Sequence, residues 1–153
     1  MGHTIRVLFF THCSRTKDDR LKGTRVKVLP CDLYKAPFVQ DFCKKCKCLD
    51  LPFAIFSDLH GFVFPTQRVE WYDKDPREIL EDESAKNALF EKALATLRQY
   101  EIAYFYHLPE TVRRLHPLYA ALVEHLTRSG VRIVEITDLT KIDAVAKKYR
   151  SSN

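Results

Sequence analysis

Three features that would narrow the function at once are missing from this sequence. No apolar run approaches the roughly 20 residues of a membrane-spanning helix, which excludes a membrane-embedded protein. No glycine-rich loop of the kind that cradles phosphates is present, which argues against a nucleoside triphosphatase. The N-terminus shows no basic-then-apolar leader, and no repeat or low-complexity segment follows. We therefore expect a cytoplasmic protein.

The composition that remains is that of an ordinary globular chain. The 153 residues fit one domain, which we expect to span residues 1–153, and 46% of them are hydrophobic. Five cysteines without a leader favour a reducing compartment and free thiols. The net charge of +5 is compatible with nucleic-acid contact without establishing it. Nothing in the sequence indicates an oligomeric state.

Short apolar runs alternate with helical patterns along the chain. We expect strands at residues 5–10, 53–56, 102–106 and 131–136, with a weaker one at 26–29. We expect helices at residues 37–48, 84–100, 117–128 and 140–149, with Ser84 and Thr140 as caps. This alternation is typical of an α/β fold. The prediction is a three-layer sandwich with a mainly parallel sheet of four to five strands, Rossmann-like in type.

A polar segment follows each of the four stronger strands. These segments are residues 11–17, 57–61, 107–111 and 137–138. Right-handed crossovers bring the carboxyl ends of parallel strands to one edge of a sheet. Ligands bind outside that edge in open α/β sheets, so we expect the functional site there.

Residues 52–75 carry the densest group of chemistry-bearing side chains. A buried strand ends in a turn that contains Asp58, His60 and Gly61, and Asp73 follows on an irregular stretch. Asp58 and Asp73 can act as a general base or as hydrogen-bond acceptors to a base or sugar. His60 is either a ligand-contacting or a structural histidine, and Gly61 permits a tight turn or a close ligand approach.

Aromatic residues around this segment have two interpretations. Tyr34, Trp71 and Tyr72 can stack on a planar base, as aromatic side chains do in nucleic-acid-binding proteins. The alternative is packing in the core, which we expect for at least one of the three.

The loop at residues 11–17 offers a second set of candidates. Ser14 and the neighbouring amides can bind an anion, with Lys17 as a point charge. Cys13 is a possible nucleophile if a base such as His12 or His60 lies close by. In the other interpretation, Cys13 is a small buried residue and Ser14 binds local backbone.

Basic side chains crowd residues 15–27, where six lysines and arginines face two aspartates. The segment is either a solvated face or a rim that attracts a phosphate.

The cysteine run is a weak match to a zinc site. Cys43 and Cys46 form one C-x-x-C, Cys48 follows, and Cys31 lies twelve residues earlier, but no second pair completes a tetrahedral set. On a helix, Cys48 would not share the face of Cys43 and Cys46. Packing thiols and a thiol- or metal-dependent protein both stay open for these four cysteines, and we assign no metal ligand and no cofactor.

The order of short motifs in the first half of the chain resembles an uncharacterised α/β family. The family pattern is Cys-Ser-x-x-Lys, Leu-Tyr followed by Phe, Leu-Ser-Ala-x-x-Gly-Leu-x-x-Pro, and Pro-Tyr-Asp. The matching residues here are Cys13, Ser14, Lys17, Leu33, Tyr34, Phe38, Ser57, Gly61, Pro65, Tyr72 and Asp73. The chain is also distantly similar to the core domain of archaeosine synthase. The resemblance covers residues 5–75 and implies a uracil-DNA-glycosylase-like fold.

This sequence departs from the family pattern at two places. Asp58 stands where the family favours alanine, and Trp71 precedes Tyr72 where it favours proline. These departures leave the substrate open, namely which base, and whether it is free or within a polymer.

The resemblance implies a nucleobase- or nucleotide-handling protein, with a nucleobase, a nucleotide, or RNA or DNA as its partner. The chemistry would be that of a glycosylase or a base-exchange enzyme in nucleic-acid modification. The candidate catalytic residues are Ser14, Asp58, His60 and Asp73, and the candidate ligand-binding residues are Cys13, Lys17, Tyr34, Ser57, Gly61 and Tyr72. The alternative is a non-catalytic nucleic-acid-binding partner of a modification enzyme, using residues 15–27 and the lysines at 44, 45 and 47.

Overall fold

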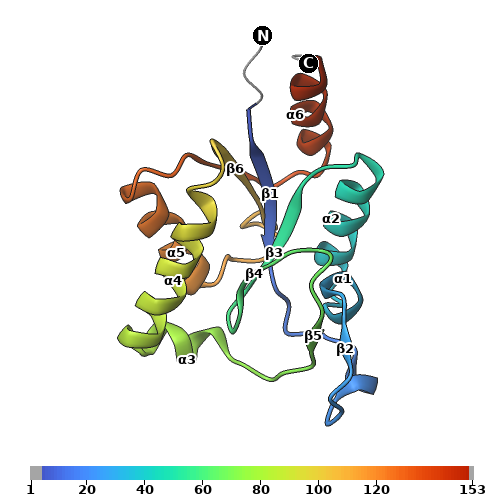
Figure 1. Cartoon of the computed structure of the whole chain (residues 1–153), viewed down its shortest axis with the longest axis vertical. Coiled ribbons are helices and arrows are strands. Elements are labelled where there is room, and N and C mark those ends of the chain that lie inside the picture. The colour runs from blue at the N-terminus through green and yellow to red at the C-terminus, as the bar shows by residue number, and fades with distance from the viewer. Residues whose placement is uncertain (1–4, 152–153) are drawn as a thin grey trace.

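Five strands form the main sheet, in the spatial order β4-β3-β1-β6-β7. The computed structural model describes residues 5–151 (Figure 1). The strands are β1 (Val7–His12), β3 (Phe53–Ser57), β4 (Gly61–Val63), β6 (Ile102–Tyr106) and β7 (Ile133–Ile136). All neighbouring pairs are parallel except β3 and β4, which are antiparallel. The prediction of an α/β fold with a mainly parallel sheet is therefore confirmed.

Helices lie on both sides of this sheet (Figure 1). They are α1 (Pro30–Leu33), α2 (Pro37–Cys48), α3 (Pro76–Glu81), α4 (Glu83–Leu97), α5 (Pro117–Arg128) and α6 (Thr140–Ser151). Helices α3, α4 and α5 contact one another on one side. On the other side, an ion pair of 2.7 Å between Lys45 Nζ and Asp143 Oδ2 joins α2 to α6. No helix in the described residues is long and apolar enough to cross a membrane.

Local signals explain where the helices begin. Helices α2 and α5 each start with proline at the first turn, where a missing N–H costs nothing, and both match the predicted ranges. Helix α4 differs from the prediction at both ends. Asp82, one residue before the helix, accepts the Ala85 N–H, so Ser84 is not the cap, and the helix ends at Leu97 rather than at residue 100. At α6 the Asp138 carboxylate accepts the Thr140 N–H, a role that the prediction gave to Thr140 itself.

The apolar run at residues 26–29 does not join the main sheet. Its strand β2 (Lys27–Val28) pairs antiparallel with β5 (Val69–Glu70) in a separate two-stranded sheet. A 3-10 helix (Asp19–Leu21) precedes β2. This small sheet holds the basic segment against residues 52–75, as Figure 1 shows beside α1.

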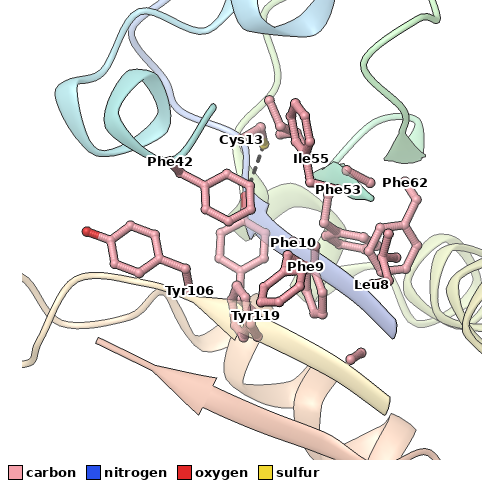
Figure 2. Packing of buried hydrophobic residues seen from close by; sticks show 14 of the residues in the cluster. Leu8, Phe9, Phe10, Cys13, Phe42, Phe53, Ile55, Phe62, Tyr106 and Tyr119 are labelled. Carbon is pink, nitrogen blue, oxygen red and sulfur yellow. Dashed lines mark hydrogen bonds between the residues drawn. The ribbon is translucent and has the colours of Figure 1, made fainter. Parts of the chain in front are cut away.

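Aromatic packing fills the space between the sheet and the helices (Figure 2). The Phe10 ring on β1 stacks on that of Phe105 on β6 at 4.6 Å between centroids. The Phe42 ring on α2 is parallel to that of Tyr106 at 5.9 Å. Burying each large side chain stabilises the fold by about 1.5–3 kcal/mol, so these contacts hold the strand ends in place.

Candidate ligand-binding site

A cavity of about 410 Å³ lies where the carboxyl ends of β1, β3 and β6 meet. This volume is within the range of small-molecule sites. The loop after β1, the turn after β3, the start of α3 and the residues between β6 and α5 form its wall. Its lining consists of His12, Cys13, Ser14, Arg15, Lys17, Phe38, Asp58, Lys74, Asp75, Pro76, His107, Leu108, Arg113, Arg114, Leu115, His116, Pro117 and Tyr119.

Positive charge dominates this lining. The cationic side chains are Arg15, Lys17, Lys74, Arg113 and Arg114, and the carboxylates are Asp58 and Asp75. A concave surface with an excess of one charge concentrates ligands of the opposite sign. The cavity is therefore suited to an anionic ligand.

Lys17 is the most enclosed of these cations, with only 8% of its surface exposed. Its backbone forms an isolated antiparallel bridge with Tyr34, which fixes the stem of the side chain. Its Nζ lies 4.5 Å from the centroid of the Tyr72 ring. In the described part of the chain no carboxylate lies within ion-pair distance of Nζ. Lys17 thus lines the cavity as an enclosed cation whose side-chain contacts in the described residues are with aromatic rings and not with an acid.

Asp58 lies at the turn after β3 and is 3% exposed. Ser57 shapes this turn, because its Oγ accepts the N–H groups of Leu59 and His60, both at 3.1 Å. Gly61 ends the turn with a φ of +77°, which a side chain would disfavour. Burial raises the pKa of Asp58, and the nearby Lys17 charge opposes part of that rise. Such a carboxyl can accept a proton or a hydrogen bond inside the cavity.

Cys13 extends from the end of β1 toward the same point. Its Sγ lies 3.5 Å from Asp58 Oδ1 and 3.3 Å from the Tyr119 hydroxyl, the contact dashed in Figure 2. Burial raises the pKa of the Cys13 thiol to about 12, and the Asp58 charge adds to the effect. Because the thiolate is the reactive form, this setting favours the buried-residue interpretation of Cys13 over the nucleophile.

A cluster of hydroxyl groups lies behind the cavity wall. The Tyr72 hydroxyl is 2.7 Å from that of Tyr34, 2.8 Å from Ser57 Oγ and 3.3 Å from Asp58 Oδ1. Tyr34 is fully buried, and neither tyrosine lines the cavity. Both rings therefore support Asp58 and Lys17 from behind and present no face to a ligand in the cavity.

His12 provides an uncharged aromatic wall. Its ring stacks on Tyr119 at 4.4 Å between centroids. Burial lowers the pKa of His12 to about 4, so the ring is neutral at pH 7. Its Nδ1 lies 2.8 Å from the carbonyl oxygen of Cys13, so Nδ1 carries the hydrogen. The ring also lies against Phe38, at 4.8 Å between centroids, so aromatic side chains already pack against it on both sides.

The predicted site residues fall into three groups in the structure. Four of them line the cavity, namely Cys13, Ser14, Lys17 and Asp58. The second group lies behind or beside the wall and consists of Tyr34, Ser57, His60, Gly61 and Tyr72. Asp73 is exposed and does not belong to the lining. Ser14 Oγ donates to the Thr16 carbonyl at 2.7 Å, which is the local backbone bond considered above.

Several lining residues have no counterpart among the candidates from the sequence. Arg113, Arg114, His116 and Tyr119 come from the chain between β6 and the first turn of α5, and Lys74 precedes α3. The sequence does contain one signal for this part of the wall, namely two adjacent arginines, Arg113 and Arg114, a few residues after the end of β6.

The cysteine run does not form a metal site in the described residues, where no group of three or more His, Cys, Asp or Glu side chains can hold an ion. Cys31, Cys43 and Cys46 are buried and Cys48 is exposed.

No family model, no curated protein and no solved structure matches this chain. The geometry of the cavity therefore carries the functional argument.

Proposed function

We propose that this protein binds a nucleotide, free or within RNA or DNA, in the cavity at the carboxyl edge of the sheet, and handles its base. The observation that carries this proposal is Lys17, an enclosed cation without an acid partner in the described part of the chain, which lines a cavity with four further cations. A phosphate group would supply the missing negative charge.

The other walls of the cavity suit the rest of a nucleotide. Asp58 offers a hydrogen-bond acceptor to a base, and Phe38 and Leu108 add apolar surface to the lining. The volume of about 410 Å³ is of the right order for one nucleotide. A nucleotide in a duplex would have to leave the base stack to enter.

Cleavage of the base–sugar bond is the reaction that this arrangement can support. In hydrolysis, a water oxygen bonds to C1′ while the C1′–N bond breaks and leaves its electron pair on the base. A carboxylate accepts the water proton, and Asp58 and Asp75 both line the cavity. The base-exchange form of the reaction replaces water with an incoming base.

The arrangement of the fold supports the same proposal. A mainly parallel sheet with helices on both sides fits a three-layer sandwich of the uracil-DNA-glycosylase-like or Rossmann-like kind. In such folds the ligand lies beyond the carboxyl ends of the strands, where this cavity lies.

The alternative of a non-catalytic nucleic-acid-binding surface has less support. It needs one continuous basic face made of residues 15–27 and of Lys44, Lys45 and Lys47. The three lysines lie at the C-terminal end of α2, which leads into the start of β3, whereas residues 15–27 follow the end of β1. Because β1 and β3 are parallel, the two basic groups lie near opposite edges of the sheet.

Binding measurements on a matched pair of lysine variants test this proposal. Lys17→Met keeps the stem of the side chain and removes the charge. Lys22→Met removes an equivalent charge from outside the cavity, 5.4 Å from the centroid of the Trp71 ring. The probes are nucleoside 5′-monophosphates, ribose 5-phosphate, nucleosides and short single-stranded RNA and DNA, tested by thermal shift and calorimetry.

We expect a nucleotide or oligonucleotide near 100 times its Kd to stabilise the native protein by about 2.7 kcal/mol. Lys17→Met should weaken binding by about 10- to 100-fold, the value of a charge-assisted bond, and Lys22→Met should leave it unchanged. Equal binding by the two variants, or no binding of any probe, would contradict the proposal.

A further inference from the structure

A chain of hydrogen bonds runs from Ser57 through Tyr72 to Asp58. The direction of each bond follows from the single hydrogen that each hydroxyl group can donate. The Oγ of Ser57 accepts the N–H groups of Leu59 and His60. Those two bonds use both lone pairs of the hydroxyl oxygen. In the 2.8 Å contact between Ser57 Oγ and the Tyr72 hydroxyl, Ser57 is therefore the donor.

The Tyr72 hydroxyl has one hydrogen to pass on. It lies 3.3 Å from Asp58 Oδ1, and a carboxylate oxygen can only accept, so Tyr72 donates to Asp58. Tyr34, whose hydroxyl is 2.7 Å away, must then donate to Tyr72. This is the one assignment that satisfies all three contacts of Tyr72.

Cys13 brings a second hydrogen to the same carboxylate oxygen. Its Sγ accepts the Asp58 N–H at 3.5 Å and lies 3.3 Å from the Tyr119 hydroxyl. Because burial raises the pKa of Cys13 to about 12, the thiol keeps its hydrogen at neutral pH. Tyr119 thus donates to the sulfur, and the thiol donates to Asp58 Oδ1 at 3.5 Å.

These two chains of donors leave the carboxylate of Asp58 with one free oxygen. Oδ1 receives Tyr72 and Cys13, whereas no donor in the described part of the chain contacts Oδ2. Among the described residues, Asp58 has no side-chain oxygen that is both shielded from solvent and without a hydrogen-bond partner. Since Asp58 lines the cavity, Oδ2 keeps contact with its interior.

We propose that Asp58 Oδ2 selects a nucleobase that presents an N–H donor, with Tyr72 and Cys13 as positioning residues that fix the orientation of the carboxylate. This specificity rests on the nucleotide site proposed above. If the edge of the base that meets Oδ2 carries only acceptor atoms, no hydrogen lies between the two acceptors and no hydrogen bond forms. Such a base should therefore bind less tightly.

Pairs of nucleotides that differ in this donor test the proposal by calorimetry. AMP, GMP and IMP carry an N–H donor on the six-membered ring, and purine riboside 5′-monophosphate has the same ring, sugar and phosphate without one. UMP and its N3-methyl derivative form the matching pyrimidine pair. We expect at least one donor-bearing nucleotide to bind about tenfold or more tightly than its donor-lacking counterpart.

Asp58→Asn should reverse this preference. The amide oxygen of the substituted side chain would take the hydrogens of Tyr72 and Cys13, which places the NH2 group where Oδ2 was. The site would then offer a donor, and purine riboside 5′-monophosphate, with its ring acceptor, should bind more tightly than AMP. Tyr72→Phe should reduce the native preference without reversing it, because one of two orienting hydrogens is lost. Tyr100→Phe, which removes a phenol outside the cavity, should change nothing.

The outcomes separate this inference from the function on which it rests. If nucleotides bind and Lys17→Met weakens them, but donor-bearing and donor-lacking partners bind equally, the nucleotide site stands and the role of Asp58 falls. If Asp58→Asn keeps the native order of preference, the orientation by Tyr72 and Cys13 is wrong. If no nucleotide binds the folded native protein, both proposals fall.

Discussion

The carboxyl edge of the sheet and helix α2 both concentrate reactive side chains, but they arrange them differently. At the edge, Cys13 directly after β1 and Asp58 in the turn after β3 lie 3.5 Å apart, and the Tyr72 hydroxyl lies 3.3 Å from the same Asp58 oxygen. On α2, Cys46 is fully buried in the core while Cys48, two residues later, is exposed. Parallel strands deliver groups to one edge, whereas successive residues of a helix point about 100° apart.

The two regions also differ in charge, because the edge carries ionised side chains and the buried face of α2 carries neutral thiols. The edge keeps an enclosed lysine and a carboxyl beside a cavity, so charges there can meet a ligand. On α2, burial raises the pKa of Cys46, so this thiol stays neutral and acts as a small apolar group. Charged groups at the edge are therefore placed where they can meet a ligand, whereas Cys46 on α2 packs in the core.

The largest effect that we expect comes from His12 at the edge. Its pKa is lowered to about 4 in the folded protein, below the ordinary value of 6.5. Between these values the unfolded chain binds more protons than the native state, so stability is lost as the pH falls from 6.5 to 4. We expect a loss of about 2–3 kcal/mol from this group, allowing for partial solvent contact. His12→Gln should remove that slope in urea unfolding, and an unchanged slope would contradict the assignment.

A pair of cysteine variants tests the packing role of α2. Cys46→Ser places a hydroxyl in a fully buried apolar position and should lower the free energy of unfolding by about 1–2 kcal/mol. Cys48→Ser, at an exposed position, should change it by less than about 0.5 kcal/mol. Neither should alter nucleotide binding. Stabilisation of the native protein by added Zn²⁺, lost in Cys46→Ser, would break the comparison.

The pH dependence of stability that comes from Asp58 should have the opposite sign to that from His12. Its pKa is raised by burial, so the native state holds its proton more tightly than the unfolded chain, and stability falls as the pH rises through the raised pKa. Asp58→Asn should therefore stabilise the protein at pH 8, and by less at pH 4. Thermal unfolding at the two pH values measures this difference. A destabilised variant at pH 8 would show that the carboxylate supports the fold.

The smallest effect is expected at the exposed rim of the cavity. Arg113→Ala should weaken nucleotide binding by about two- to fivefold, because exposed charges contribute little. The loss should shrink as salt is raised, since screening weakens exposed charges. Arg128→Ala, which removes a cation paired with Glu124 on α5, is the control. Equal effects of the two substitutions would indicate a diffuse rather than a local attraction.

The sequence predicted the elements whose signals are local. Residues 37–48 and 117–128 match α2 and α5 because a proline opens each helix and a periodic apolar stripe follows. The reversal into β4 gave no such signal. It depends on the positive φ of Gly61 and on pairing with β3, a contact that the apolar pattern of three residues does not specify.

The candidate site was predicted in part, since Cys13, Ser14, Lys17 and Asp58 line the cavity. Tyr34 and Tyr72 were expected as stacking partners, and they lie behind the wall instead. An aromatic pattern indicates burial or contact, but it does not say on which side of a loop the ring lies.

The sequence by itself determined the α/β class and predicted polar segments at the carboxyl edge of the sheet, because periodicity and polarity are carried by neighbouring residues. Only the tertiary structure decided that Lys17 has no acid partner in the described part of the chain, that Asp58 keeps one oxygen free, and that Arg113 closes the wall. Those facts depend on contacts between residues tens of positions apart. Such contacts arise only when the strands pair and the loops pack against their ends.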